Sequence, residues 1–322
     1  MKMVAERSGV SVATVSFVLS GRRSGQVAAS AATAERIRAV ADELGYRPNQ
    51  AARAIRTGRS GLVLLSLTQL SDPWCQSVSR AMNDACGGLP VQPLILADGD
   101  WGEVLDGQPV DAAFVDAASV VDLERITGLV RRGLRMIVFS DDLEPDGFDV
   151  IRSRQQEGCA LAMDYLLAER STVGCLTGSD PDRPGWHREH AYLAALEASG
   201  IAPRPGHFQR YTQDHASVYE SALRLLDRDD PPSAIFATSD FAAITAVNVA
   251  QRLGLSIPDD LAVVGVGNTE EAAEMSPGLT SVGPTDFFDT LAKLIIDTAE
   301  HPDDHQPKRH DFPWQLHHRQ TG

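Results

Sequence analysis

The 322-residue sequence has no apolar run approaching the ~20 residues that a membrane-spanning helix needs. Its N-terminus lacks the apolar core of a signal peptide. The four cysteines are scattered and form no CxxC pair, as is typical of reduced thiols in a cytosolic protein. A GxSxG nucleophile motif, sequence repeats and low-complexity runs are also missing. We therefore expect a cytoplasmic protein that neither spans a membrane nor depends on disulfides.

Positive charge is scarce overall but concentrated at the N-terminus. The whole chain has a formal net charge of −15. Residues 1–60 contain ten basic and four acidic side chains, so they carry +6 and the remainder carries −21. A basic module on an acidic body is typical of a nucleic-acid-binding unit attached to a regulatory domain. The acidic body repels phosphates, so we expect DNA to contact only the N-terminal region.

The stretch 4–19, VAERSGVSVATVSFVL, predicts two helices joined by a tight turn. Gly9 permits the turn, and the Ser11 hydroxyl can cap the second helix. The alternative is an ordinary helical hairpin without a DNA-binding role. The residues expected on the outward face of the second helix are Val12, Ala13, Thr14, Ser16 and Phe17.

A third amphipathic helix is predicted over residues 33–44, TAERIRAVADEL, and Gly45 ends it. Together with this helix, a series of motifs resembles the LacI/GalR family of bacterial transcription regulators across nearly the whole chain. The motifs follow one another as VAERSGVSVATVS, ELGYRPNQAARAIRTGRSG, ATSDFAAITA, IPDDLAVVGV and SPGLTSV. The resemblance implies a helix-turn-helix headpiece, residues 1–46, followed by a hinge helix and linker, residues 47–60.

Short apolar strands alternate with helical patterns from residue 61 onward, which predicts parallel sheets covered by helices. The resemblance implies that residues 61–322 form a doubly wound α/β body of two lobes, like a periplasmic binding protein, for effector binding and dimerisation. It implies a homodimeric repressor that binds near-palindromic operator DNA and responds to a small-molecule effector. The alternative is a small-molecule-binding protein or enzyme in which the N-terminal helices are incidental.

Nine residues are expected to contact DNA by this resemblance. Val12, Ala13 and Phe17 occupy base-contacting positions, with Phe17 where arginine is common. Phe17 either touches a thymine methyl group or packs on the backbone and the headpiece. Ile55 matches a leucine that wedges into the minor groove, the alternative being a plain linker packed on the body. The full set is Ser11, Val12, Ala13, Thr14, Ser16, Phe17, Asn49, Arg53 and Ile55.

The effector site is expected beyond the carboxyl ends of the strands. Trp74 matches a ligand-stacking aromatic residue and Arg188 a ligand-gripping arginine, the alternatives being packing between lobes and a solvated helix arginine. Gly267-Asn268 and Arg154-Gln155 replace pairs that usually contain aspartate. These changes predict an acidic effector, or a loss of effector control, instead of an ordinary neutral sugar. The candidate residues are Trp74, Arg154, Arg188, Ser239, Asp240 and Asn268.

The glycine-containing segment at residues 265–270, GVGNTE, follows a strand but lacks the third glycine of a dinucleotide-binding loop. We therefore expect no cofactor, and we expect neither a metal site nor enzymatic activity. Family members usually carry a few more residues before the stretch matching residues 1–3. We accordingly expect a chain extended upstream to bind its operator more tightly.

Overall fold

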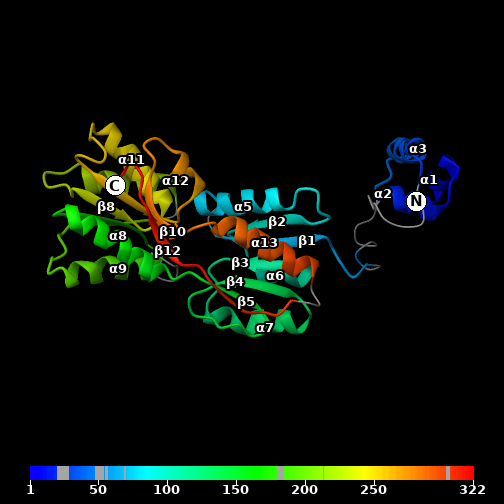
Figure 1. Ribbon diagram of the computed structural model, residues 1–322, viewed down its shortest axis with the longest axis horizontal. Coiled ribbons are helices and arrows are strands. Elements are labelled where there is room, and N and C mark those ends of the chain that lie inside the picture. Colours follow the sequence, from blue (N-terminus) through cyan, green and yellow to red (C-terminus); the bar gives the residue numbers. More distant parts are fainter. Residues whose placement is uncertain are drawn as a thin grey trace. The chain divides into compact units, whose positions relative to one another are not determined.

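The computed structural model divides the chain into two compact units, an N-terminal unit (Met1–Gly61) and a body (Leu62–Gly322) (Figure 1). No helix in the described part of the chain is long and apolar enough to cross a bilayer. The structure describes the chain apart from residues 20–28, 48–53, 55–56, 69, 180–184, 213 and 302–304, and apart from the side chains of residues 185–187.

Among the described residues, the N-terminal unit contains three complete helices: α1 (Lys2–Ser8), α2 (Val12–Leu19) and α3 (Ala31–Glu43). Helix α1 ends where Gly9 adopts a left-handed φ of 63°, a conformation that other residues adopt at a cost. The Ser11 hydroxyl accepts the N–H of the residue three positions later at 3.1 Å, which caps α2. The turn and the cap predicted from the sequence are confirmed.

A small apolar core joins the three helices of the N-terminal unit. Its buried side chains recur at helical spacing, so each helix turns one stripe inward. The opposite side of α2 stays open to solvent, where Val12 is 45% exposed and Ala13 is also exposed. Phe17 is only partly exposed and packs against the core. The core residues are Val4, Ala5, Val15, Val18, Ile37 and Ala41.

The first lobe of the body is a parallel six-stranded sheet in the order β11-β5-β4-β3-β1-β2. Helices α5 and α13 bury apolar side chains on one face of the sheet, and α6 and α7 bury theirs on the other. Its elements are β1 (Leu62–Leu67), α5 (Pro73–Ala85), β2 (Gln92–Ala97), α6 (Trp101–Gly107), β3 (Ala112–Val115), the 3-10 turn η1 (Val120–Asp122), α7 (Leu123–Arg131), β4 (Arg135–Phe139), β5 (Asp149–Arg152), α13 (Phe287–Glu300) and β11 (Arg309–Asp311).

The second lobe repeats this plan with the strand order β12-β10-β9-β8-β6-β7, in which only the β10–β12 pair is antiparallel among the described strands. Helices α10 and α11 cover one face, and α8 and α9 the other. Its elements are α8 (Gln155–Glu169), β6 (Val173–Gly178), α9 (Gly185–Ala198), β7 (Phe208–Tyr211), α10 (His215–Leu226), β8 (Ala234–Ala237), α11 (Asp240–Arg252), β9 (Ala262–Val266), α12 (Glu270–Glu274), β10 (Thr280–Pro284) and β12 (Trp314–His317).

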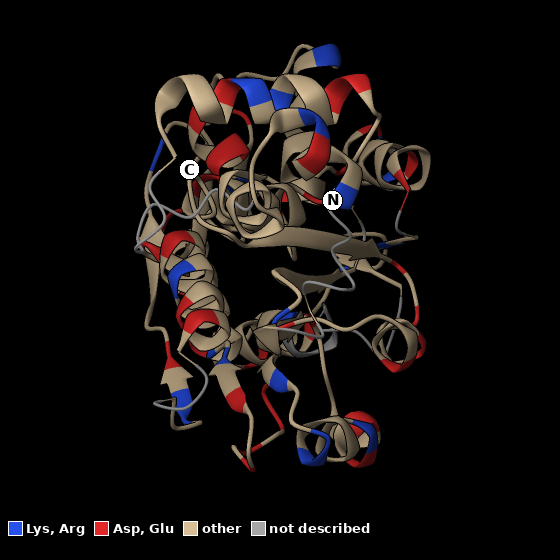
Figure 2. Ribbon diagram, turned by 90° about the vertical axis from the view of Figure 1, so that its right-hand side faces the viewer, with Lys and Arg blue, Asp and Glu red and all other residues tan. Residues whose placement is uncertain are grey.

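The central strands carry almost no charge, whereas the helices of the body carry many acidic and basic residues (Figure 2). Strands β1, β3, β8 and β9 contain no charged residue, as expected for strands covered on both faces. The chain passes between the lobes after β5, after β10 and after β11. The two predicted lobes with parallel sheets are therefore confirmed.

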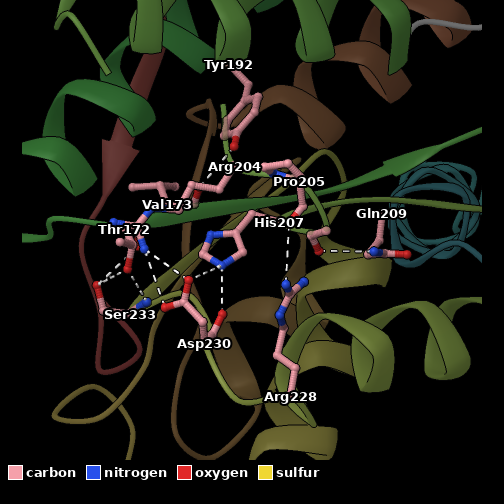
Figure 3. A network of polar contacts seen from close by, with 11 residues as sticks. Thr172, Val173, Tyr192, Arg204, Pro205, His207, Gln209, Arg228, Asp230 and Ser233 are labelled. Carbon is pink, nitrogen blue, oxygen red and sulfur yellow. Dashed lines mark hydrogen bonds and ion pairs between the residues drawn. The ribbon is translucent and has the colours of Figure 1, made fainter. Parts of the chain in front are cut away.

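The amino ends of β6 and β8 are closed by a polar network (Figure 3). The buried His207 donates from Nε2 to the carbonyl oxygen of Asp230 at 2.8 Å. The Asp230 carboxylate also pairs with Arg204 at 3.2 Å, and the hydroxyls of Thr172 and Ser233 lie 3.1 Å apart. Since these groups satisfy one another, this end of the second lobe is structural, and open polar groups must be sought at the carboxyl ends.

Candidate functional site

A cavity of about 140 Å³ lies between the two lobes, at the carboxyl ends of their strands. Parallel strands all end at this edge, so the residues that follow them converge on one space. Asp116 follows β3, Ser153 follows β5, Thr238 follows β8 and Gly267 follows β9. The lining residues are Thr68, Asp72, Trp74, Cys75, Asp116, Phe139, Arg152, Ser153, Gly178, Arg188, Tyr211, Thr238, Ser239, Val266, Gly267, Pro284, Phe287, Phe312 and Trp314.

Arg188 of α9 reaches the cavity and is fixed in place by two neutral acceptors. Its Nε donates to the side-chain oxygen of Gln155 at 2.9 Å, and its Nη1 donates to the carbonyl oxygen of Thr238 at 2.7 Å. Gln155 in turn donates to the Asp141 carboxylate of the first lobe at 2.6 Å. The guanidinium is thus held by two second-lobe residues, one of which is linked to the first lobe, and its charge stays available to a ligand.

Trp74 lines the cavity from the first turn of α5. Asp72 caps this helix by accepting the Trp74 N–H at 2.9 Å, and Pro73 occupies the first helical position. The Trp74 ring centroid lies 5.7 Å from that of Phe139 and 6.0 Å from that of Phe287. Trp74 therefore belongs to an aromatic wall, and it both packs within the protein and presents a surface to the cavity.

Two carboxylates, Asp72 and Asp116, also line the cavity. Asp116 accepts the Thr68 hydroxyl at 2.8 Å. Burial, with a smaller contribution from the nearby carboxylates of Asp240 and Asp116, raises the pKa of Asp72 to about 6. Burial likewise raises the pKa of Asp116. The cavity therefore places two acidic groups in an environment that disfavours their charge.

Ser239 and Asp240 begin α11 but differ in what they face. The Ser239 hydroxyl lines the cavity, caps α11 and lies 3.0 Å from the Tyr211 hydroxyl. Asp240 is fully buried outside the lining, and its two oxygens accept the N–H and hydroxyl of Thr269 and the hydroxyl of Ser281. The geometry makes Asp240 a clamp between α11, α12 and β10, in addition to its position at the helix start.

Arg154 and Asn268, two of the residues expected to bind effector, lie outside the cavity lining. Arg154 precedes α8 with a φ of 47° and pairs with Glu157 at 2.8 Å, on the exposed side. Asn268 donates to the carbonyl oxygen of Pro284 at 3.3 Å and accepts from Arg319 at 2.7 Å. The geometry therefore gives no support to the acidic effector inferred from Arg154.

Four residues that were not predicted from the sequence also line the cavity: Asp72, Asp116, Arg152 and Ser153. Each lies within five residues of the end of a first-lobe strand. The rule that ligands bind beyond strand carboxyl ends points to them when it is applied to every strand.

In the N-terminal unit, the outward face of α2 presents the residues expected to read DNA. Ser11, Val12 and Ala13 are exposed, while Thr14 and Ser16 are partly exposed. An ion pair of 2.9 Å between Arg7 and Glu43 links α1 to α3. Three expected hinge contacts, Asn49, Arg53 and Ile55, lie outside the described residues.

A three-helix unit with a helix-turn-helix, followed by a two-lobed α/β body with a polar cavity, defines the class of ligand-responsive DNA-binding proteins. Residues 1–49 match the model of the lacI family of bacterial regulatory proteins, and residues 164–321 match the periplasmic binding protein-like domain. By these two matches the chain carries a lacI-family regulatory domain at its N-terminus and a periplasmic binding protein-like domain in its C-terminal half.

Curated relatives and solved structures match this chain over nearly its whole length. The chain is 27% identical to the HTH-type transcriptional repressor PurR of Yersinia pestis, covering 92% of this chain and 90% of that protein. It is 25% identical to the repressor CytR of Escherichia coli K12, with coverages of 88% and 84%. A LacI family regulator from Silicibacter pomeroyi has the same fold, with a TM-score of 0.77, 20% identity and coverages of 99% and 98%.

Proposed function

We propose that this protein is a sequence-specific DNA-binding repressor whose affinity for its operator is controlled by a small molecule bound between the two lobes. The observation that carries the proposal is the combination, in one chain, of a helix-turn-helix unit and a cavity bounded by both lobes. The curated relatives PurR and CytR are named as transcriptional repressors.

Charge supports DNA binding through the N-terminal unit. The first 60 residues carry +6 whereas the rest of the chain carries −21, so phosphate attraction is confined to one unit. The exposed face of α2 offers small side chains and hydroxyls that can approach base edges in the major groove. Residues 47–60 serve as the hinge helix and linker in this proposal.

A helix-turn-helix unit also implies two-fold symmetry of the protein and of its operator. A helix-turn-helix dimer reads two half-sites, which makes its operator near-palindromic. The Lac repressor, whose structure was solved as a dimer on operator DNA, has the same fold with a TM-score of 0.70 and 20% identity. We propose a homodimer formed through the body, acting in the cytoplasm on the nucleoid and without enzymatic activity. Effector binding closes the lobes and separates the two hinge segments.

Selection from random duplex DNA by the purified full chain, followed by gel shift on the selected sites, tests this function. We expect a near-palindromic sequence with two equal half-sites, bound by a dimer. Light scattering at micromolar concentration supplies the oligomeric state. Enrichment of no sequence above random DNA contradicts the function, and a monomer both in solution and on DNA contradicts the assembly.

A further inference from the structure

The cavity offers more carboxylates than cations to a ligand. Among the described residues that line it, four carry formal charges: Asp72, Asp116, Arg152 and Arg188. Arg152 is committed to the first lobe, because its terminal nitrogens donate to the carbonyl oxygen of Leu143 at 2.7 Å and to the Glu144 carboxylate at 2.9 Å.

Among the described lining residues, Arg188 is then the one cation left to balance the charges of Asp72 and Asp116. Its Nε and Nη1 bind the uncharged oxygens of Gln155 and Thr238. One positive charge cannot neutralise Asp72 and Asp116 together. The described part of the cavity therefore carries an excess negative charge when both carboxylates are ionised.

Two buried polar atoms at the cavity lack hydrogen-bond partners among the described residues. They are the hydroxyl of Ser153, which is 2% exposed, and Nε of Arg152. Asp72 uses one oxygen to cap α5, and its other oxygen has no described donor. Asp72, which lines the cavity, therefore keeps one oxygen that can accept a hydrogen bond from a ligand.

An aromatic wall lies beside the carboxylates. Trp74, Phe139 and Phe287 have ring centroids within 6.0 Å of one another, and Phe312 lies 4.9 Å from Phe287. Trp314 of β12 also lines the cavity. Aromatic faces attract cations through their quadrupole, and apolar ring bodies pack against them.

We propose that the effector is an organic cation, with an ammonium group bound by Asp72 and Asp116 and a ring or apolar body packed against the aromatic wall. The inference rests on the proposed function and names the ligand class of the same cavity. An anionic ligand meets the two carboxylates and is repelled. A hydroxyl on the ligand can pair with Ser153 and Arg188 in the same pose.

The test uses matched ligand triplets with one carbon skeleton and three end groups: phenethylamine, 2-phenylethanol and phenylacetate; cyclohexylmethylamine, cyclohexylmethanol and cyclohexanecarboxylate; 6-amino-6-deoxyglucose, glucose and glucuronate. Thermal shift and then calorimetry on the full chain at pH 7.5 measure binding. We expect at least one amine to bind tenfold or more tightly than its alcohol, and the carboxylates to bind not at all.

Asp72→Asn retains an oxygen that can cap α5 but removes the charge. We expect this variant to lose about tenfold in amine affinity and to bind the alcohol as before. Asp164→Asn is the matched control, since Asp164 is exposed on α8 away from the lining, and it should bind both ligands like the parent chain. An unchanged amine preference in Asp72→Asn overturns the proposal.

The pH profile adds a second readout. The groups facing Asp72 are Asp116, Asp240, Arg188 and Tyr211. Amine affinity should rise from pH 5 to pH 7 as Asp72 ionises, while alcohol affinity stays flat. Binding of alcohols or carboxylates without any amine preference overturns the ligand class and leaves the repressor function standing, because DNA selection tests that function separately. Failure of every amine to bind also overturns the proposal.

Discussion

The N-terminal unit and the body place their functional side chains in opposite environments. In the N-terminal unit, Ser11, Val12 and Ala13 lie on an exposed helix face, outside the small core. In the body, Asp72, Asp116 and Arg188 are partly buried and lie beside the packed strands. Changes on the exposed face should therefore alter recognition with little effect on folding, whereas changes at the cavity should alter both.

The same contrast holds for charge. The N-terminal unit has scattered surface cations that can pair with a phosphate backbone. Their contribution to DNA affinity depends on the salt concentration. The body confines a few charges near apolar side chains, where each needs its own partner. Asp240 has such partners and Asp72 has few, although both lie at the start of a helix in the same body. Partner number, more than position along the chain, determines what each carboxylate does.

The largest predicted effect concerns Asp240. Asp240→Ala leaves the N–H of Thr269 and the hydroxyl of Ser281 buried without their acceptor. We expect a loss of about 3 kcal/mol in the free energy of unfolding of the body, because unsatisfied buried donors cost ~1–3 kcal/mol each. Urea denaturation followed by circular dichroism measures it. A change below about 1 kcal/mol would contradict the clamp role.

Asp72 should behave in the opposite way. Its pKa is raised from 3.8 to about 6 in the folded protein, so folding takes up protons between these values and stability falls as pH rises through this window. Asp72→Asn removes the unfavourable charge and keeps an oxygen for the Trp74 N–H. We expect it to stabilise the protein by about 1–2 kcal/mol at pH 7.5, given ~1.4 kcal/mol per pKa unit.

The control for this prediction is pH itself. At pH 4 the folded protein holds Asp72 mostly protonated, so the variant and the parent should unfold at nearly equal urea concentrations. Equal stabilisation at pH 4 and pH 7.5 would show that the gain comes from packing and not from charge. A destabilised variant at pH 7.5 would show that the carboxylate is needed for the cap of α5.

Much of the fold could be predicted from hydrophobic patterning. The alternation of short apolar strands with helical patterns predicted the parallel sheets, and the observed strands β1 and β3 are such apolar runs, each bounded by polar residues or glycine. Helix α3 begins two residues earlier than expected, since the Ser30 hydroxyl caps it by accepting the Thr33 N–H at 3.2 Å. A cap is a local signal that periodicity alone misses.

The cavity was less predictable, because it depends on residues far apart in the chain. Arg188 and Trp74 could be expected from resemblance, and both line the cavity. Arg154 was expected to bring a cation there. Instead, it precedes α8 with a left-handed φ of 47°, and its guanidinium pairs with Glu157. The position of the adjacent Ser153 and Arg152 depends on where β5 ends, and sequence motifs fix such ends to within only a few residues.

A third prediction sharpens the comparison from the side of the N-terminal unit. If residue 55 wedges into the minor groove as the resemblance implies, Ile55→Ala should weaken specific operator binding about tenfold and leave non-specific binding nearly intact, because such a wedge stabilises only bent DNA. Ile55 itself lies outside the described residues, and nearby Gly58 donates its N–H to the carbonyl oxygen of Ala54 at 2.8 Å. Fluorescence anisotropy on the selected operator and on random DNA measures both affinities.

Two outcomes of that experiment are informative. Equal losses on operator and random DNA would mean that residue 55 supports the linker and does not act at the base step. The unfolding free energy of the body should not change in Ile55→Ala, since the body is a separate compact unit. A destabilised body would contradict the separation of recognition from folding on which the comparison rests.

The smallest predicted effect concerns Phe17, which lies between the two environments. Its ring is partly exposed on α2 and also packs against the core of Val4, Val15 and Ile37. Phe17→Ala should change base preference at one position in each half-site, because the ring offers an apolar contact to a thymine methyl group and no hydrogen bond. Selection from random DNA by both proteins measures the preference. Identical selected sequences would show that the ring serves packing alone. In that case the melting temperature of the N-terminal unit should fall while the sequence preference stays the same.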